Sequence, residues 1–373
     1  MGEVSLRADH VGSLLRSDEV KNARKSFYEE HTIDKSELTE IENQSIKALI
    51  TNQENIGLKA VTDGEQRRSF WHYDFMDGLD GMEMVERDPD AGVQFAGVKL
   101  RPIFPTINSK VDFPADHPHL QHFEFVAQHT NVTPKISIPG PSCCHFRTSL
   151  ADISPQEYDD IEVFTSDISN AYKKAVTAFY DVGCRYLQMD DIFFAYLCDP
   201  KHREAAKAKG HDPDYLIQRY AWMMHEAIKD RPSDMTIAMH MCRGNFRSTH
   251  AAEGAYDAVA DAVFNQTGVD VFFMEYDTDR AGGLEPLSLM AKGNQRVMLG
   301  FITTKDGNLE ELDWVKMKFD EASKYIDLKQ LGIAPQCGFA STEEGNSLTR
   351  DDQTRKLELI VKAAEAIWGG VEN

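Results

Sequence analysis

The sequence predicts an α/β fold, a closed (β/α)8 TIM barrel, because eight short apolar runs alternate with long amphipathic stretches. The runs typical of β-strands are residues 6–11, 59–62, 135–138, 186–189, 236–240, 269–275, 296–302 and 332–336. The stretches with helical periodicity are residues 37–54, 156–182, 213–229, 251–264, 308–324 and 350–368. Eight alternating units favour a barrel over an open doubly wound sheet, which is the alternative fold. The glycine-rich phosphate motifs of nucleotide-binding open sheets are absent from the sequence.

Two segments interrupt this alternation, and we expect both to decorate a single barrel domain that spans residues 1–373. Residues 16–33 are rich in charge and predict an N-terminal helical extension after the first strand. Residues 66–134 are much longer than an ordinary connection in this fold and predict a long loop insertion after the second strand. The insertion holds a histidine-rich patch made of His117, His119, His122 and His129. Its spacing matches no recognised metal motif, so we interpret the patch as part of a solvated loop.

The charge and the apolar content of the chain exclude several classes of partner. The 373 residues carry a formal net charge of −21. This charge disfavours nucleic acid and anionic membranes, since both are bound by clusters of Lys and Arg. No apolar run approaches the roughly 18 residues of a membrane helix, and the N-terminus lacks the apolar core of a signal peptide. Six cysteines are too few for a disulfide scaffold. We therefore expect a cytoplasmic protein that binds small molecules.

The ends of the later strands carry side chains that bind soft metal ions. His240-Met241-Cys242 ends the fifth run, Glu275 ends the sixth, and Cys337 follows the eighth. Residues i and i+2 of a strand point to the same face, so His240 and Cys242 converge. An imidazole, two thiolates and a carboxylate suit a tetrahedral Zn²⁺ site. Taken singly, Glu275 is typical of a salt bridge at the barrel end and Cys337 of a buried thiol. Their joint placement favours zinc.

Polar residues also follow the first, second and fourth runs, at the barrel end where functional residues gather. The three segments are His-Val-Gly-Ser at 10–13, Asp-Gly-Glu at 63–65 and the aspartate pair at 190–191. Each has a purely structural alternative. Aspartate is a preferred helix N-cap, and Glu65 has Arg67 and Arg68 nearby as partners for an ion pair.

These motifs, in this order, resemble those of the cobalamin-independent methionine synthase family, specifically its catalytic C-terminal barrel. The pieces that carry the resemblance are residues 10–13, 63–65, 188–191 (Gln-Met-Asp-Asp), 240–242, Glu275 and Cys337. They span almost the whole chain. Zinc-dependent thiol alkyltransferases and uroporphyrinogen decarboxylase-like barrels are wider relatives that share the architecture.

The resemblance implies an enzyme similar to 5-methyltetrahydropteroyltriglutamate–homocysteine S-methyltransferase, which methylates the thiol of homocysteine to give methionine. It implies that zinc is bound by His240, Cys242, Glu275 and Cys337. It also implies that homocysteine is bound by Val11, Gly12, Ser13, Glu65 and Asp190. Ionised carboxylates only accept hydrogen bonds and so suit an α-ammonium group. Backbone N–H groups around a glycine suit a carboxylate. Zinc favours the thiolate of a thiol whose pKa is otherwise about 8.5.

The sequence departs from the family at the residues expected to handle the methyl donor. The family places a proton-donating histidine after the seventh strand, where this chain has Thr303-Thr304-Lys305. The aromatic residue expected to help bind folate after the third strand is also not evident. The remaining candidates for the general acid are His10, His72 and His145. The donor therefore stays open between methyltetrahydrofolate, a methylated corrinoid on a partner protein, and another methylated sulfur or nitrogen compound.

Three other functions compete with homocysteine methylation. The first is a thiol alkyltransferase or lyase that uses the same zinc on a different thiol, with a corrinoid or sulfonium as the methyl donor. The second is a non-catalytic barrel in which zinc serves structure or regulation. The third is a decarboxylase similar to the uroporphyrinogen enzymes, but that chemistry needs no zinc and leaves His240, Cys242 and Cys337 unexplained.

Overall fold

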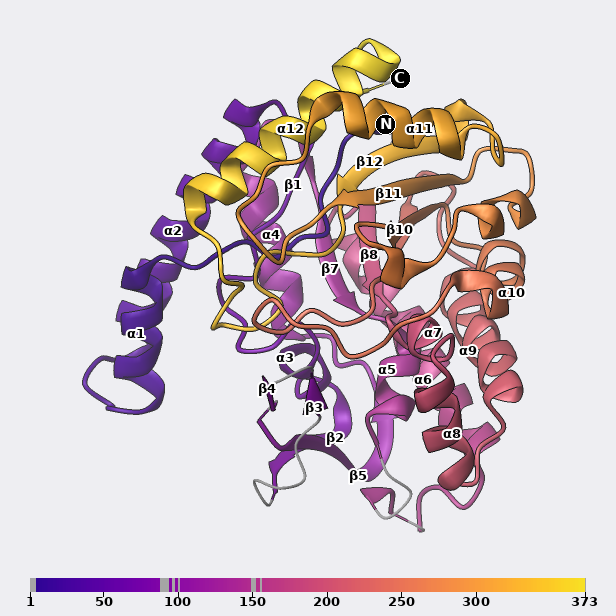
Figure 1. Ribbon diagram of the computed structural model, residues 1–373. Coiled ribbons are helices and arrows are strands. Elements are labelled where there is room, and N and C mark those ends of the chain that lie inside the picture. The colour runs from indigo at the N-terminus through magenta and orange to yellow at the C-terminus, as the bar shows by residue number, and fades with distance from the viewer. Residues whose placement is uncertain are drawn as a thin grey trace.

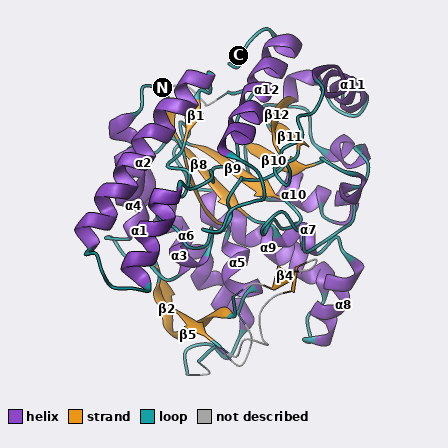
Figure 2. Cartoon of the chain, turned by 60° about the vertical axis from the view of Figure 1, so that its left-hand side comes forward, coloured by secondary structure: helices purple, strands orange, loops and turns teal. Residues whose placement is uncertain are grey.

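The protein folds as a (β/α)8 barrel, as predicted, in a computed structural model that describes residues 5–87, 94–95, 98–99, 101–148, 152–154 and 156–372. Six parallel strands form one sheet in the order β12-β11-β10-β9-β8-β7. They are β7 (Ile136–Pro139), β8 (Tyr186–Asp190), β9 (Thr236–Met241), β10 (Val271–Glu275), β11 (Arg296–Ile302) and β12 (Leu331–Pro335). Figure 2 shows these strands at the centre of the molecule with helices around them.

The first two predicted strands complete the barrel wall between β12 and β7. Residues 6–11 form an extended segment rather than a regular strand. In this segment Ala8 forms a parallel bridge with Ile333 of β12, and the backbone N–H groups of residues 9 and 333 donate across the pair. The short strand β1 (Ala60–Val61) pairs in parallel with β6 (Thr133–Pro134), which leads directly into β7. The Thr62 hydroxyl donates a hydrogen bond to the Gly12 carbonyl at 2.6 Å and joins the two segments.

The interior of the barrel is filled by side chains from most of its strands. One buried cluster consists of Leu6, Val11, Ala60, Tyr186, Ala238, Val271, Phe273, Met298 and Ala334. Beside it lies a fully buried ion pair, in which the Lys135 ammonium group is 2.9 Å from the Asp9 carboxylate. The Tyr186 hydroxyl donates to the same carboxylate at 2.7 Å. The barrel is therefore packed through its centre, which leaves its carboxyl end for binding.

Helices cover the outside of the barrel, and most lie where the periodicity predicts them (Figure 1). The predicted helices correspond to α2 (Lys35–Ile56), α6 (Ile161–Asp181), α9 (Pro213–Ile228), α10 (Ala260–Gln266), α11 (Leu312–Ala322) and α12 (Arg350–Trp368). The N-terminal extension is α1 (Asp18–Tyr28). Helix α2 begins with a capping box between Asp34 and Glu37, and α12 begins with one between Thr349 and Asp352.

The helix predicted at residues 251–264 is much shorter than expected. Its first half is a loop and a 3₁₀ turn, η3 (Tyr256–Ala258), and only the second half belongs to α10. The Arg243 guanidinium donates a hydrogen bond to the Gly254 carbonyl in this loop. Gly254 has a φ of +119°, a conformation that L residues rarely adopt. Short helices outside the 66–134 segment are α5 (Pro141–Phe146), α7 (Phe193–Tyr196), α8 (Pro200–Ala208), η4 (Asp279–Ala281), η5 (Glu285–Leu289) and η6 (Leu328–Gln330).

The segment at 66–134 is not the irregular loop that the sequence predicts. It contains α3 (Tyr73–Met76), α4 (Pro118–His129), and the antiparallel pair of β2 (Asp80–Glu86) and β5 (Ile103–Asp112). Two short strands, β3 (Gln94–Phe95) and β4 (Val98–Lys99), form a second pair. Figure 1 shows β2 and β5 projecting from one end of the barrel.

The histidine patch in this segment is partly packed: His117 and His119 are buried, His122 is half-buried and His129 is exposed. His117 and His119 are buried at the start of α4, and the His117 ring stacks on Phe113 with ring centres 4.9 Å apart. His117 Nε2 also hydrogen-bonds to the Phe75 carbonyl at 3.0 Å. These aromatic contacts account for the burial. Our interpretation of the patch as part of a solvated loop is therefore wrong for His117 and His119, and most of the patch lies in a helix rather than a loop. None of the helices in the described ranges is long and apolar enough to cross a membrane.

Candidate functional site

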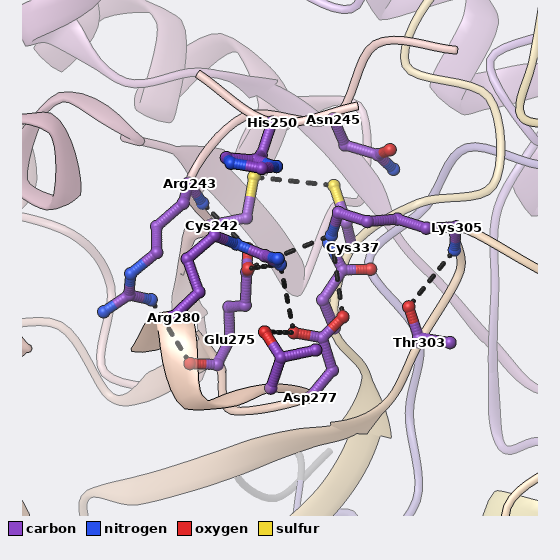
Figure 3. Close-up of polar contacts among 12 residues, drawn as sticks. Cys242, Arg243, Asn245, His250, Glu275, Asp277, Arg280, Thr303, Lys305 and Cys337 are labelled. Atoms are coloured by element: carbon purple, nitrogen blue, oxygen red, sulfur yellow. Dashed lines mark hydrogen bonds and ion pairs between the residues drawn. The ribbon is translucent and has the colours of Figure 1, made fainter. Parts of the chain in front are cut away.

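Three predicted metal ligands meet at the carboxyl end of the barrel. His240 lies in β9, Cys242 follows that strand, and Cys337 follows β12. All three side chains are buried, and their ligand atoms lie within 4.8 Å of one another. The two sulfur atoms are 3.6 Å apart (Figure 3). Among the described residues, this is the one group of three or more His, Cys, Asp or Glu side chains with metal-binding geometry.

The chemistry of this cluster fits a metal ion. Neither ring nitrogen of the buried His240 has a hydrogen-bond partner, and the nearest carboxylate oxygen, on Asp190, is 3.6 Å from Nδ1. Buried polar atoms are otherwise nearly always paired. Burial would lower the pKa of His240, but the Cys337 thiolate and the Asp190 carboxylate raise it to about 10. Burial would raise the pKa of Cys337, but the adjacent Cys242 thiol and the His240 charge hold it well below its usual value. The cluster thus brings two cysteine sulfurs and a histidine ring to a single point, and a metal ion that bound there would displace the protons that these groups hold.

Glu275, the fourth predicted ligand, is not part of this group. It ends β10, and its carboxylate accepts hydrogen bonds from the backbone N–H of Arg243 and the guanidinium of Arg280, each at 2.8 Å. Lys305 lies 3.8 Å from the same carboxylate. Burial would raise the pKa of Glu275, but Lys305 and Arg243 lower it to about 2. Figure 3 shows Glu275 held among these cations next to the two cysteines.

The two predicted acidic residues of the amino-acid site both lie in the cavity beside the sulfur atoms. Glu65 is buried, its Oε1 accepts from the Ser137 hydroxyl at 2.8 Å, and its Oε2 has no hydrogen-bond partner. Burial is the main reason that the pKa of Glu65 is raised to about 7, and the Asp190 charge adds to the shift. Arg68 opposes that shift and lies 3.4 Å from Glu65. The ion pair weighed as the structural alternative therefore exists, but it leaves one carboxylate oxygen free.

The aspartate pair divides between the cavity and the scaffold. Asp190 accepts a hydrogen bond from the Gln188 side chain at 2.6 Å, and that amide also donates to the Val11 carbonyl. Asp191 instead accepts from the Ser142 hydroxyl, and its backbone N–H donates to the His240 carbonyl. Asp190 lines the cavity, whereas Asp191 ties neighbouring strand ends together.

The segment from Val11 to Ser13 contacts both the acidic residues and the loop that carries Cys337. A Cβ atom on Gly12 would come within 3.2 Å of the Ser137 hydroxyl, and the backbone φ there is +139°. The Ser13 carbonyl accepts from the Phe339 backbone N–H at 2.9 Å. Close packing of Ser13 against Gly338 fixes the Cys337 loop over this segment.

Most of the predicted site residues border one cavity of about 550 Å³. Its lining includes Val11, Ser13, Glu65, Phe70, Trp71, His72, Arg147, Asp190, Ile192, His240, Cys242, Gly244, Asn245, Phe246, Cys337, Gly338, Ser341 and Thr342. Gly12 and Glu275 are not among the residues that line this cavity. Polar and apolar side chains share the wall of this cavity, and that mixture is typical of a small-molecule site.

Of the three histidines considered as general acids, only His72 borders this cavity. Both of its ring nitrogens lack a partner, and its ring stacks on Trp71 with centres 4.4 Å apart. Burial lowers the pKa of His72 well below its usual value, and the Arg147 charge adds to the effect. His10 is buried away from the lining, and His145 hydrogen-bonds to the Tyr220 hydroxyl in a neighbouring cavity.

Several residues of the cavity were not predicted from the sequence. Phe70 and Trp71 belong to the segment that we interpreted as a loop. They do not directly follow a predicted strand, and so the sequence did not indicate them as site residues. Arg147 follows the third strand by several residues and ends α5. Asn245 donates to the Thr304 hydroxyl at 3.2 Å and to the Gly338 carbonyl at 2.8 Å. A single polar residue of these types gives no sequence signal of its own.

The fold and the site together define a class of protein, a (β/α)8 barrel with a His-Cys-Cys cluster next to a buried acidic pocket. The family described as "Cobalamin-independent synthase, Catalytic domain" matches residues 7–366, which is nearly the whole chain. The chain belongs to this family, as the motifs predict.

The chain is also similar to individual proteins at three levels of sequence identity. The chain is 46% identical over 364 residues to the uncharacterized protein YxjH of Bacillus subtilis (strain 168), covering 97% of this chain and 94% of that protein. It superposes with a TM-score of 0.77 on the structure of a putative vitamin-B12 independent methionine synthase from Listeria monocytogenes, at 36% identity, covering 99% and 100% of the two chains. A B12-independent methionine synthase from Shewanella sp. W3-18-1, solved with selenomethionine, gives a TM-score of 0.68 at 17% identity, covering 97% and 98%, and shows the shared fold.

Proposed function

We propose that this chain, as a single catalytic domain, transfers a methyl group to the thiol of homocysteine in a zinc-dependent reaction that yields methionine. The observation that carries the proposal is that the His240, Cys242 and Cys337 cluster and the acidic residues Glu65 and Asp190 border the same cavity. A thiol-binding metal centre next to an ammonium-binding pocket is what a short amino acid with a terminal thiol requires.

The metal site would be formed by His240, Cys242 and Cys337, with Glu275 as the fourth ligand. Glu275 ends the strand next to β9, and its low pKa keeps it ionised and ready to bind a cation. Its present contacts with Arg280 and Lys305 would have to exchange with the metal. Zinc, when bound, acts as a Lewis acid that favours the thiolate form of a substrate thiol.

The amino-acid end of homocysteine would be held by the acidic pocket. The free oxygen of Glu65 and the carboxylate of Asp190 would accept hydrogen bonds from the α-ammonium group. The backbone N–H groups near Gly12 and Ser13 would donate to the α-carboxylate. The pKa of Glu65 is raised to about 7, so an arriving ammonium group would draw this carboxyl into its ionised form.

The methyl transfer itself forms an S–CH₃ bond and breaks the bond between that methyl group and the donor atom. The bonding electron pair stays with the donor, and a nitrogen leaving group then takes up a proton. His72 is the general acid that we propose for this proton, since it alone of the three candidates borders the cavity. Because its pKa is lowered, the His72 ring is neutral at neutral pH and carries one N–H. It would donate either that proton or a proton that it first takes up from solvent.

We propose methyltetrahydrofolate as the methyl donor. A corrinoid partner finds no support, because the family is cobalamin-independent. The second candidate function is alkylation of a different thiol, which is favoured by one observation. The chain carries Thr303-Thr304-Lys305 where the methionine synthases carry a histidine, and Lys305 is engaged with Glu275 and Asp277.

A direct assay separates these functions. The zinc-loaded protein is incubated with homocysteine and either methyltetrahydrofolate, methylcobalamin or S-methylmethionine, and methionine is measured. We expect methionine with methyltetrahydrofolate alone. Turnover with another thiol at a higher kcat/KM than with homocysteine would support the second candidate function. Absence of methionine with all three donors would contradict the proposal.

A further inference from the structure

Two segments that are far apart in the sequence form the two halves of the candidate site. The acidic turn (residues 63–68) carries a carboxylate of the amino-acid pocket, and the cysteine segment (residues 337–342) begins with a sulfur of the metal cluster. Residues 13–16 contact both. Their backbone hydrogen-bonds to the acidic turn at 3.0 Å and to the cysteine segment at 2.9 Å. This connection ends at Arg16, whose side chain also contacts both halves.

The Arg16 guanidinium bridges the two halves with four hydrogen bonds to backbone carbonyls. One of its nitrogens donates to the carbonyls of Glu65 at 2.6 Å and of Arg68 at 2.7 Å, both in the acidic turn. A second nitrogen donates to the carbonyls of Ala340 at 3.3 Å and of Thr342 at 3.1 Å, both in the cysteine segment. The residue is 3% exposed, and burial lowers its pKa only to about 10, so it is a cation at neutral pH. A planar fork of donors suits such a bridge, because it can address two segments at once.

The acidic turn has a backbone conformation that its surroundings must hold. Glu65 has a φ of +57°, in the left-handed region that residues other than glycine rarely adopt. Its backbone N–H donates to the Asp63 carboxylate at 2.8 Å, and its carbonyl accepts from the Arg68 backbone N–H at 3.0 Å as well as from Arg16. These bonds fix the direction in which the Glu65 side chain leaves the backbone. Arg16 therefore helps to hold the carboxylate that faces the cavity.

Arg16 holds the cysteine segment at the cavity wall in the same way. Ser341 and Thr342 line the cavity, and the carbonyls that accept from Arg16 belong to Ala340 and Thr342, on either side of Ser341. The segment begins with Cys337, so its path decides where that sulfur lies. One buried side chain thus ties the backbone of the acidic pocket to the backbone of the metal cluster.

We propose that Arg16 is a positioning residue that sets the distance between the acidic pocket and the metal cluster, and thereby the chain length of the thiol amino acid that the site accepts. This inference rests on the proposed function and deepens it, because it assigns substrate length to a residue that does not line the cavity. An amino acid whose ammonium group and thiol bind at two fixed points fits at one length only. A displacement of about 1 Å at such a site can cost about a hundredfold in rate.

A series of thiols that differ by one methylene tests this inference by binding alone. Cysteine, homocysteine and the homologue with one more methylene are titrated calorimetrically into the zinc-loaded protein. We expect the wild type to prefer homocysteine over both others by at least about tenfold, because one methylene in a shaped pocket is worth about 10–200-fold. In Arg16→Lys this preference should fall to about threefold or less, since a lysine ammonium group is a point charge that cannot span both segments. Zinc per chain should be unchanged.

Arg7→Lys is the matched control. Arg7 is 5% exposed and donates to the carbonyls of Lys329 at 2.9 Å and of Leu331 at 2.6 Å. Leu331 begins β12, at the end of the barrel away from the site. The control should therefore lower the melting temperature, as Arg16→Lys does, but keep the chain-length preference of the wild type. A purely structural role of Arg16 would change the melting temperature and not the preference.

Glu343→Gln loosens the same connection from outside and decides the question if Arg16→Lys does not fold. Glu343 directly follows the cysteine segment and lies 3.2 Å from the Arg24 guanidinium, which also donates to the Arg67 carbonyl of the acidic turn at 2.8 Å. The Glu343 side chain is 28% exposed, so the fold tolerates the loss of its charge. We expect the preference for homocysteine to fall in the same direction as in Arg16→Lys, but by less.

An unchanged chain-length preference in Arg16→Lys, or in Glu343→Gln where Arg16→Lys does not fold, would overturn the inference. Loss of zinc from Arg16→Lys would also overturn it, because Arg16 would then support the metal site alone. A wild type that prefers cysteine or the longer homologue would instead contradict homocysteine as the substrate, and a shift of that preference in Arg16→Lys would still support the role of Arg16. A wild type without any preference among the three thiols would contradict both.

Discussion

The double variant Cys242→Ser/Cys337→Ser is expected to lose most of its zinc and all measurable methyl transfer. Serine keeps the shape of the side chain but offers a hydroxyl, which does not ionise at neutral pH as a thiolate does. Both sulfur atoms of the cluster are removed together, so His240 is the one member of the described cluster that keeps its ligand atom. The loss in metal affinity should exceed the roughly 10–100-fold that follows loss of an outer-sphere partner. Zinc per chain, measured by mass spectrometry after dialysis, checks this result.

The matched control for this variant is Cys198→Ser. Cys198 is a half-buried thiol outside the cluster, and its sulfur donates a weak hydrogen bond to the Phe194 carbonyl that a hydroxyl can keep. The Cys198→Ser variant should retain about one zinc per chain and the methyl-transfer activity of the wild type. Full zinc content in the double variant, or a wild-type protein that takes up no zinc, would remove the basis for the proposed metal site.

Glu65→Gln is expected to weaken binding of the amino acid by about tenfold or more and to leave the metal in place. The substitution removes a charged acceptor for the α-ammonium group, and such charge-assisted hydrogen bonds are worth about 1.5–3 kcal/mol. Methionine is the informative ligand, because it has no thiol that titrates. In the wild type its affinity should fall as the pH drops below about 7, where Glu65 takes up a proton. In Glu65→Gln that pH dependence should be lost, since the amide does not titrate.

Asp190→Asn provides a second test of the same pocket, and Glu54→Gln provides the control. Glu54 accepts hydrogen bonds from Thr130 and Asn131 and lines neither cavity. Calorimetry with methionine and metal analysis are run on all three variants. Loss of zinc from Glu65→Gln would show that Glu65 supports the metal site, and that its assignment to amino-acid binding alone is wrong. Unchanged methionine affinity would exclude Glu65 from the amino-acid site.

The parts of the fold that follow from local pattern could be read from the sequence. Helix α12 and strand β11 begin and end where the periodicity places them, because both are long and uninterrupted. The approach of His240 to Cys337 also follows from pattern, since parallel strands of a barrel end at the same rim. Residues 6–11 look like a strand but form only a bridged, extended segment, because tertiary contacts rather than propensity decide that position.

Side chains that depend on distant partners could not be predicted. The position of Glu275 follows from its strand, but its contacts with Arg280 and Lys305 depend on two loops whose course has no sequence signature. The burial of His117 and His119 arises from aromatic neighbours far along the chain. The surroundings of Arg147 could not be predicted either. None of the described residues places a carboxylate next to it, and this depends on the tertiary structure rather than on the local sequence.

The most direct test of the account is X-ray absorption at the zinc edge, recorded on the zinc-loaded protein before and after addition of homocysteine. In the proposed site the two cysteines of the cluster would contribute two sulfur ligands, and we expect homocysteine to raise the sulfur coordination from about two to about three. Methionine, which lacks a thiol, should leave the spectrum unchanged. A spectrum that homocysteine does not alter, although calorimetry shows it to be bound, would contradict activation of the thiol by the metal.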